Sequence, residues 1–346
     1  MTRTPTAPVD PCDADAPSAW DGPDGDIRTE HETLSDAAVA GHDRHLSATA
    51  AITSDHHRAD HPRETTQPPV PTTRRTTPMP TDPMASPRFP RTSRYHPDWI
   101  RSSVSGGANS LWLTEWLTEA MALRPGMRVL DLGCGRGASS VFLHREFDVE
   151  VWATDLWFSA DERLERIRDA GVGHAVFPLH ADARALPFAA GFFDAAISID
   201  SFVYYGTDDL YLNYLARFVK PGGQIGIAGA GLIREIDGPI PEHLAAWWEP
   251  SMACLHSADW WRRHWERSGI ACVDVADTMT DGWRYWLEWQ RAIAPDNEPE
   301  INALTADGGR HLGYVRAIAQ RRSDTALDEP ISSIPVTYTR QPVYRS

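Results

Sequence analysis

Three glycines at every second position, Gly133, Gly135 and Gly137, follow the short apolar run 128–132, and Asp131 lies just ahead of them. Glycine permits backbone angles that other residues avoid, and it lets a ligand come close to the main chain. A strand that ends in such a turn and leads into a helix is a device for binding anions and nucleotides. This stretch therefore predicts a nucleotide site at the carboxyl end of the strand.

The glycine motif alone does not identify the nucleotide. Gly133, Gly135 and Ala138 also fit the GxGxxG/A pattern of dinucleotide-binding proteins. Asp155, twenty residues past Gly135 and at the end of the next strand candidate, is suited to hold a ribose in either case. An NAD-dependent oxidoreductase is thus one alternative, although it should carry a second glycine motif after the third strand candidate, where the sequence has none.

The elements that position these residues alternate along the chain. Apolar runs predict strands at 128–132, 149–154, 175–180, 195–200, 224–228, 271–277 and 314–319. Apolar periodicity and boundary residues predict helices at 110–121, 138–147, 160–169, 208–219, 257–267 and 283–293. Alternation of this kind favours an α/β fold with a parallel sheet covered by helices on both faces.

Composition divides the chain into three parts. Residues 1–93 hold 14 of the 27 prolines but one of the 14 tryptophans, so they cannot bury enough apolar surface to offset their ordering entropy. We predict a disordered tail at 1–93, a folded domain at 94–322 and a second tail at 323–346. Within the domain, residues 231–268 are rich in tryptophan and proline, which predicts a helical cap insertion after the fifth strand.

Four segments resemble the class I S-adenosylmethionine (SAM)-dependent methyltransferases, in particular small-molecule enzymes similar to the ubiquinone/menaquinone-biosynthesis methyltransferases. They read "VLDLGCGRG", "VWATD", "HADARALPFAAGFFDAAISID" and "RFVKPGGQIGIAG". The resemblance covers residues 105–230 well and 270–322 in outline. It implies a Rossmann-like, doubly wound, mostly parallel seven-stranded sheet whose last strand is antiparallel.

The resemblance also implies a cofactor site, with SAM as the cofactor. Gly133 and Gly135 would line the methionine part, and Asp131 would help to hold its amino group. Asp155 would take both ribose hydroxyls, and Leu156 would lie against the adenine. The alternatives from the residues themselves are that Asp155 is a cap or turn residue and that Asp131 orders the glycine loop.

Three further positions belong to the site that the resemblance implies. Asp182 would accept a hydrogen bond from the adenine amino group, with the Ala183 backbone beside it. Asp200, just past the fourth strand, would flank the methionine part and the mouth of the substrate site.

Catalysis by such an enzyme is mainly positioning, because a sulfonium methyl group is already electrophilic. A general base is needed only where the nucleophile must lose a proton. Tyr204 and Tyr205 follow the fourth strand and are candidates for packing the substrate or holding a cation, although they could equally be core aromatics. His256, just before a predicted helix, is a candidate base, with a capping or surface histidine as the alternative.

Charge and composition restrict the partners. A net charge of −15, with a single lysine, argues against nucleic acid. The four scattered cysteines form no CxxC pair, so we predict no metal site and expect the reducing cytoplasm. No apolar run reaches eighteen residues and the first thirty lack an apolar core, so neither a membrane helix nor a signal peptide is expected. The predicted function is SAM-dependent methyl transfer to a small molecule, with a SAM-binding sensor lacking transfer activity as the main alternative; the oligomeric state is left open.

Overall fold

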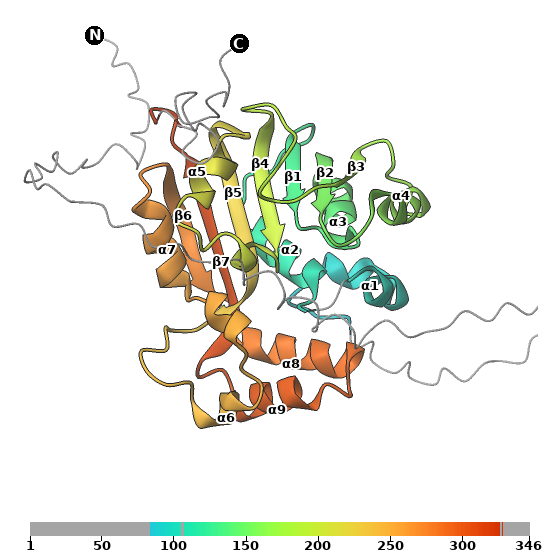
Figure 1. The fold of residues 1–346 in the computed structure, drawn as a ribbon. Helices are drawn as coiled ribbons and strands as arrows, with labels where there is room; N and C mark the ends of the chain where they lie inside the picture. The colour runs from blue at the N-terminus through green and yellow to red at the C-terminus, as the bar shows by residue number, and fades with distance from the viewer. Residues whose placement is uncertain (1–83, 105–106, 326, 328–346) are drawn as a thin grey trace, which may run out of the picture. The chain divides into compact units, whose positions relative to one another are not determined.

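The computed structural model describes residues 84–104, 107–325 and 327. Its centre is a seven-stranded sheet in the order β3-β2-β1-β4-β5-β7-β6 (Figure 1). The strands are β1 Arg128–Leu132, β2 Glu150–Asp155, β3 Val176–His180, β4 Phe193–Ile199, β5 Val219–Leu232, β6 Ala271–Thr278 and β7 Leu312–Arg321. Neighbouring strands from β3 to β5 pair in parallel, whereas β7 is antiparallel to both β5 and β6. The predicted mostly parallel sheet with an antiparallel last strand is confirmed.

Helices cover both faces of this sheet, as the alternating pattern predicts. They are α1 Pro97–Ser103, α2 Ser110–Thr118, α3 Ala138–Phe147, α4 Ala160–Asp169, α5 Tyr211–Ala216, α6 Glu242–Ala245, α7 Ala258–Glu266, α8 Gly282–Ile293 and α9 Glu298–Asp307. Successive β1 residues point to opposite faces, so Val129 joins the core with α2 and α3, and Leu130 joins the core with α5 and α7. Figure 1 shows α8 and α9 across the end of the sheet to which the β4 arrow points.

Local sequence signals account for several helix boundaries. Helix α4 begins at a capping box, in which Ser159 Oγ accepts from Glu162 N at 3.2 Å and Glu162 Oε2 accepts from Ser159 N at 3.1 Å. Helix α3 starts directly after Gly137, whose φ of 88° no other residue type adopts easily. The predicted bounds of α3 and α4 match the structure. The helix predicted at 208–219 is shorter in the structure, because α5 ends at Ala216, and β5 already begins at Val219.

The packed region begins ahead of the predicted domain boundary at residue 94. Met84 and Phe89 are fully buried, and the Phe89 ring stacks on Trp112 of α2 with centroids 5.5 Å apart. Residues 84–93 are therefore part of the domain, and the predicted tail is too long by ten residues at this end. The remainder of that tail and most of the C-terminal one lie outside the described residues.

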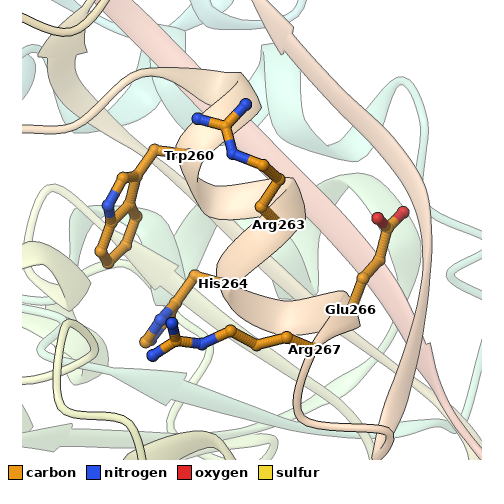
Figure 2. A pocket seen from close by; sticks show the side chains of 5 residues that line it. All are labelled: Trp260, Arg263, His264, Glu266 and Arg267. Atoms are coloured by element: carbon orange, nitrogen blue, oxygen red, sulfur yellow. The ribbon is translucent and has the colours of Figure 1, made fainter.

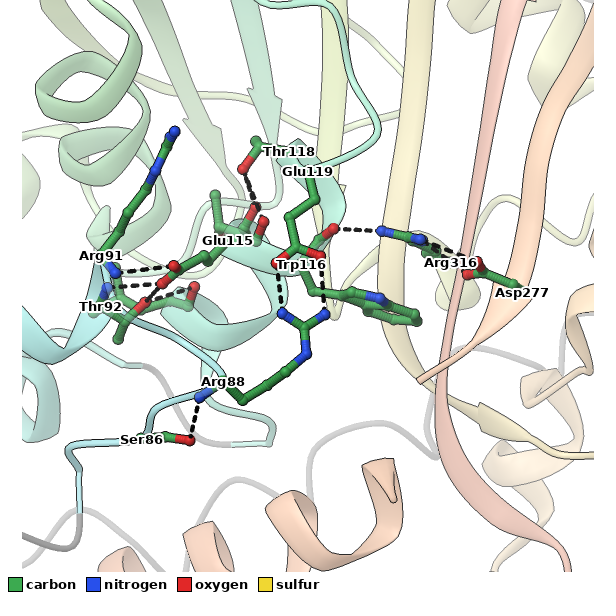
Figure 3. A network of polar contacts seen from close by, with 12 residues as sticks. Ser86, Arg88, Arg91, Thr92, Glu115, Trp116, Thr118, Glu119, Asp277 and Arg316 are labelled. Carbon is green, nitrogen blue, oxygen red and sulfur yellow. Dashed lines mark hydrogen bonds and ion pairs between the residues drawn. The ribbon is translucent and has the colours of Figure 1, made fainter. Parts of the chain in front are cut away.

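Polar contacts hold this N-terminal segment against α2 (Figure 3). The buried Glu115 carboxylate accepts hydrogen bonds from Arg91 N at 2.9 Å, Thr92 N at 2.7 Å and Thr92 Oγ1 at 2.7 Å. Arg88 forms a two-bond ion pair with Glu119 at 2.5 and 2.9 Å. Removing a buried carboxylate that accepts from three donors would leave those donors unsatisfied and lower the free energy of unfolding. Glu115 is therefore a main attachment point of this N-terminal segment.

The Trp-rich region after β5 is confirmed as an aromatic cluster, although its two ends pack differently. Trp261 and Trp265 on α7 are fully buried and meet the Phe202 ring with centroids 5.7 and 5.8 Å away. Trp247, nearer the start, packs edge-on against Trp286 of α8 at 6.0 Å. Only the earlier part, with α6, therefore covers the α8–α9 layer, whereas α7 is an ordinary helix of the sheet. Within the described part of the chain, no helix is both long and apolar enough to cross a membrane.

Candidate active site

The loop that carries Gly133 and Gly135 packs closely against neighbouring segments at the carboxyl edge of the sheet. Gly133 has a φ of 71°, and a Cβ atom there would lie 2.0 Å from Ser201 Oγ. The amides of Gly133 and Cys134 both donate to Thr154 O, at 2.9 and 3.0 Å, so the loop also rests on β2. The structure thus brings the predicted Gly133 and Gly135 together with the residue that follows Asp200.

Asp131 is fully buried beneath this loop. Its Oδ2 accepts hydrogen bonds from the hydroxyls of Ser139 and Ser140, both at 2.6 Å, which ties β1 to the first turn of α3. Burial raises the pKa of this carboxyl to about 6, although the two serine bonds lower it. Its Oδ1, which is buried as well, has no hydrogen-bond partner among the described residues, so one acceptor of this carboxylate is unsatisfied.

Asp155 is held by the backbone on three sides. Its Oδ2 accepts from Gly135 N at 2.8 Å, and its Oδ1 accepts from Trp157 N at 2.8 Å and Phe158 N at 3.0 Å. A carboxylate offers about four lone-pair sites, so the open one is on Oδ2. Asp155 therefore both fixes the loop and keeps an acceptor that a hydroxyl can reach.

Three exposed apolar side chains flank the glycine loop at the same edge. Leu156 is 48% exposed, Trp157 65% and Tyr204 63%, and the rings of Trp157 and Tyr204 lie 6.4 Å apart. The Leu156 carbonyl is held by His180 Nε2 at 2.7 Å. Contiguous exposed apolar surface often marks an interaction site. Trp157 was not predicted from the sequence, where nothing distinguishes it from a core tryptophan.

Asp182 and Ala183 are bound within the chain. Arg184 donates to both Asp182 oxygens, from Nε at 3.0 Å and Nη2 at 2.7 Å, and this partner lowers the pKa of the carboxyl. The Ala183 carbonyl accepts from Tyr211 Oη at 2.9 Å. An adenine amino group would have to share Asp182 with Arg184, so this assignment stays a prediction.

Asp200 connects two segments from a strained backbone position. Its φ is 52°, in the left-handed region, and its Oδ2 and Oδ1 accept from Ala108 N at 2.7 Å and Ala230 N at 3.1 Å. A Cβ on Gly107 would lie 2.4 Å from Oδ2. Burial raises the pKa of Asp200, against the lowering effect of both amides. The carboxylate thus holds the segment before α2 against β5 at the edge of the site.

The two predicted tyrosines have different surroundings. Tyr205 lies under the glycine loop, where its hydroxyl is 3.2 Å from Ser198 Oγ and 3.1 Å from Ser201 Oγ. Burial raises the pKa of Tyr205, which makes it a poor base. Tyr204 stands out from the surface beside Trp157. Of the two, Tyr204 is the exposed residue, and Tyr205 supports the loop.

His256 belongs to a pair that the sequence did not reveal. Its Nδ1 is 3.1 Å from Glu235 Oε2, while Glu235 Oε1 accepts from Ser257 N at 2.6 Å. The imidazole stacks on Trp260 with centroids 3.7 Å apart, and the His256 carbonyl accepts from Leu232 N at the end of β5. Glu235 therefore orients a half-buried histidine next to the carboxyl end of a central strand. The 21 residues between them leave no local spacing that would have indicated this pair.

Trp260, which stacks on His256, is part of the wall of a surface cavity of about 630 Å³ that lies along α7 (Figure 2). The cavity is lined by Trp260, Arg263, His264, Glu266 and Arg267, which all project from this one helix. None of the predicted site residues lines it. Because a single convex helix supplies every wall, this cavity does not compete with the strand edge as the active site.

The fold and the site together define a Rossmann-like nucleotide-binding protein, with ligand groups at the carboxyl ends of β1, β2 and β4. A family model described as "Methyltransferase domain" matches residues 129–223. An O-methyltransferase of Pyrenophora dematioidea is 30% identical over 223 residues, which make up 60% of this chain and 82% of that protein. The ubiquinone/menaquinone biosynthesis C-methyltransferase of Vibrio cholerae is 32% identical over 152 residues, 43% of this chain and 55% of that one.

Solved structures show the same fold. A geranyl diphosphate C-methyltransferase from Streptomyces coelicolor, in complex with S-adenosyl-L-homocysteine, has a TM-score of 0.50 at 21% identity, over 60% of this chain and 76% of that chain. A Haemonchus contortus phosphoethanolamine N-methyltransferase 2 has a TM-score of 0.51 at 16% identity, over 68% and 58%.

The chain belongs to the class I SAM-dependent methyltransferases. Its cofactor is S-adenosylmethionine, and it transfers the methyl group to a small molecule. The unsatisfied Oδ1 of Asp131 and the exposed Leu156 fit a ligand that has both an amino group and a flat apolar base. Neither a dinucleotide oxidoreductase nor a sensor without transfer activity is supported.

Proposed function

We propose that SAM lies along the carboxyl edge of β1, β2 and β4. The main chain of Gly133 and Gly135 lies under its methionine part, and the unsatisfied Oδ1 of Asp131 accepts from the amino group. Asp155 binds the ribose through the open lone pair of Oδ2, and Leu156 packs on the adenine. The support is that each residue offers an unused acceptor, bare backbone or exposed apolar surface at this edge.

The other ends of the cofactor meet Asp182, Ala183 and Asp200 in this proposal. Asp182 accepts from the adenine amino group while keeping its bond to Arg184, and the Ala183 backbone lies beside it. Asp200 borders the methionine part and holds the 107–108 segment next to it. The domain that carries this function extends from about residue 84 to 322, and we keep the cytoplasm as its proposed location.

We further propose that the acceptor is a flat apolar molecule that is methylated on a hydroxyl oxygen. The single observation that carries this proposal is the exposed ring pair of Trp157 and Tyr204 beside the cofactor edge. Aromatic faces of this kind bind flat apolar surfaces well, at about 0.5–1.5 kcal/mol per ring pair beyond the area buried. The Pyrenophora relative, named an O-methyltransferase, agrees with oxygen as the acceptor atom.

A hydroxyl acceptor must lose a proton, and His256 is the base in this proposal. Glu235 holds Nδ1, so the other ring nitrogen, Nε2, is the one that takes the proton from the acceptor. The carboxylate then stabilises the imidazolium that forms. Bound SAM supplies a methyl group that is already electrophilic, so the remaining task of the chain is to hold the oxygen in line with it and to exclude water.

A panel of acceptors with labelled SAM tests the acceptor class. Phenols, aliphatic alcohols, amines and prenyl diphosphates are compared, and the position of the label is determined by NMR. We expect O-methylated phenols, and a large rise in KM with little change in cofactor affinity for Trp157→Ala and Tyr204→Ala. Phe177→Ala, at an exposed aromatic on β3, is the matched control and should leave KM unchanged. Labelled carbon or nitrogen would refute the hydroxyl proposal.

Substitutions in the pair of His256 and Glu235 test the base separately. His256→Gln should lower kcat at least about a hundredfold at every pH where the wild type is active, within the usual range for a general base. Glu235→Gln should lower kcat less, because the imidazole keeps its Nε2. An unchanged kcat in His256→Gln would show that His256 is not the base.

A further inference from the structure

Two histidines and an aspartate from three segments converge on one point away from the cofactor edge. His243 lies in α6, Asp307 is the last residue of α9, and His311 directly precedes β7. His243 Nε2 and His311 Nδ1 each lie 2.9 Å from the same oxygen, Asp307 Oδ1, and the three atoms are all within 4.8 Å of one another. Two imidazoles and one carboxylate form the donor set that first-row divalent metals prefer.

The carboxylate at the centre is oriented in advance. Asp307 has no exposed side-chain surface, and its second oxygen, Oδ2, accepts from His311 N and Leu312 N, both at 3.0 Å. The turn after α9 uses Gly308 and Gly309, with φ of 59° and 81°, to bring His311 back over Asp307. Ile233 N in turn donates to His311 O at 2.7 Å. Bonds of this kind around a ligand commonly increase metal affinity 10- to 100-fold.

We propose that His243 Nε2, His311 Nδ1 and Asp307 Oδ1 bind a divalent cation, zinc by preference, with water completing the coordination. Around a tetrahedral zinc with bonds of about 2.0–2.1 Å, neighbouring ligand atoms are about 3.3 Å apart. The two 2.9 Å separations therefore need to open by a few tenths of an ångström, and the two imidazole nitrogens, which lie within 4.8 Å of each other, need to adjust to the same spacing. Each imidazole binds as the neutral form through the nitrogen that now faces the carboxylate. Its proton resides on the opposite ring nitrogen.

The surroundings allow a cation to reach the site and give it a structural effect. The His243 and His311 side chains are 20% and 16% exposed, so the ligand atoms are near solvent while the carboxylate is buried. The bound cation joins α6 to the α9–β7 turn. Because α6 leads directly into Trp247, which packs on Trp286 of α8, the cation fixes the part of the Trp-rich region that covers the α8–α9 layer. This site, absent from the sequence prediction, is independent of the proposed acceptor.

Zinc binding to the full chain tests the proposal. After treatment with a chelator, zinc and magnesium are titrated separately by calorimetry, and bound metal is counted by mass spectrometry. We expect one tight zinc equivalent and no comparable magnesium binding, because magnesium prefers oxygen ligands. His243→Gln and His311→Asn should each weaken that equivalent at least about a hundredfold, more than the loss of an outer partner does. His174→Gln, at an exposed histidine in the turn before β3, is the matched control.

Because any exposed imidazole is a potential zinc ligand, a residue-specific measurement on the wild type accompanies the titration. Labelling with diethylpyrocarbonate is followed by peptide mass spectrometry with and without one equivalent of zinc. Zinc should protect His243 and His311 and leave His174 reactive. SAM binding and circular dichroism establish that the variants fold. Equal zinc affinity in the variants and the wild type, no tight equivalent in the wild type, or unchanged labelling of the two histidines would overturn the proposal.

Discussion

Replacing Asp155 by asparagine separates its two roles, in the loop and in the cofactor site. The asparagine oxygen can keep the bonds to Trp157 N and Phe158 N, which places the new NH₂ group against Gly135 N. A buried amide that faces another donor costs about 1–3 kcal/mol. For a domain of this size that corresponds to a melting temperature about 2–12 °C lower. The variant should therefore fold, with reduced stability.

The same substitution removes the acceptor that we assign to the ribose. A hydrogen bond to a charged group contributes about 1.5–3 kcal/mol, so the Kd for SAM should rise about 10- to 150-fold. Calorimetric titration measures this rise, and fragments make the test specific. 5′-Methylthioadenosine, which keeps the ribose, should lose affinity by the same factor, whereas methionine should not.

Asp161→Asn, at an exposed acid in the first turn of α4, serves as the control and should change neither quantity. A variant that melts lower but binds SAM within twofold of the wild type would show that Asp155 only orders the loop. The assignment of the ribose would then be wrong, even though the loop geometry stands.

Three other substitutions test the framework around the site. Gly133→Ala should abolish SAM binding and lower the melting temperature sharply, because its Cβ would lie 2.0 Å from a serine oxygen. Gly126→Ala, which has a similar φ but open space around it, should lower the free energy of unfolding by only about 1–2 kcal/mol. Burial raises the pKa of Asp131 from 3.8 to about 6, although the hydrogen bonds from two serines lower it. Between these two pH values the folded chain therefore holds a proton on Asp131 that the unfolded chain has lost. The free energy of unfolding should consequently fall by up to about 3 kcal/mol as the pH rises from about 4 to above 6, and urea unfolding of Asp131→Asn should show a smaller fall. Glu115→Gln should lose about 1–3 kcal/mol in urea unfolding, because its amide keeps only one acceptor oxygen and places an NH₂ group against at least one of the backbone amides of residues 91 and 92. Glu119→Gln, in an exposed ion pair, should lose less than about 1 kcal/mol.

The parts of the fold that the sequence predicted well are those where local chemistry leaves little choice. The capping box at Ser159 and the glycine at 137 define the starts of α4 and α3, and short apolar runs define the strands. Neighbouring parallel strands then bring the residues after β1, β2 and β4 to one edge without any further information. For this reason the sequence predicts that these residues lie together, although the roles of the individual residues toward SAM came from the family resemblance and remain predictions.

The N-terminal boundary was missed because its determinants are not local. Phe89 lies in a stretch of prolines and threonines that has no periodicity, and it becomes a core residue only through Trp112, some twenty positions away. The segment is held by Glu115, which in the sequence is one acid on a helix with an apolar stripe. The amino-acid composition of a long segment does not report single tertiary contacts of this kind. The boundary predicted from composition therefore came ten residues too late.

The two halves of the candidate site differ in what encodes them. The cofactor half depends on demands of the main chain: Gly133 must adopt a positive φ, and the carboxylate of Asp155 must accept amides at a fixed distance along the chain. Such demands leave a pattern in the sequence. The acceptor half that we propose consists of two pairs, Trp157 with Tyr204 and His256 with its carboxylate partner, and the members of each pair are distant in the sequence and meet only in the folded chain.

The chemistry explains why the acceptor half has no fixed pattern. A sulfonium methyl group is reactive as bound, so the chain needs no invariant nucleophile, and its loops are free to vary with the acceptor. Side chains such as Trp157 and Tyr204 can change without disturbing the glycine loop, because they point out from it into solvent. It follows that substitutions at these two residues should alter which molecule is methylated while SAM affinity stays nearly constant, and substitutions at Gly133 or Asp155 should do the reverse. A Tyr204 variant that lost SAM binding in proportion to activity would contradict this division of the site.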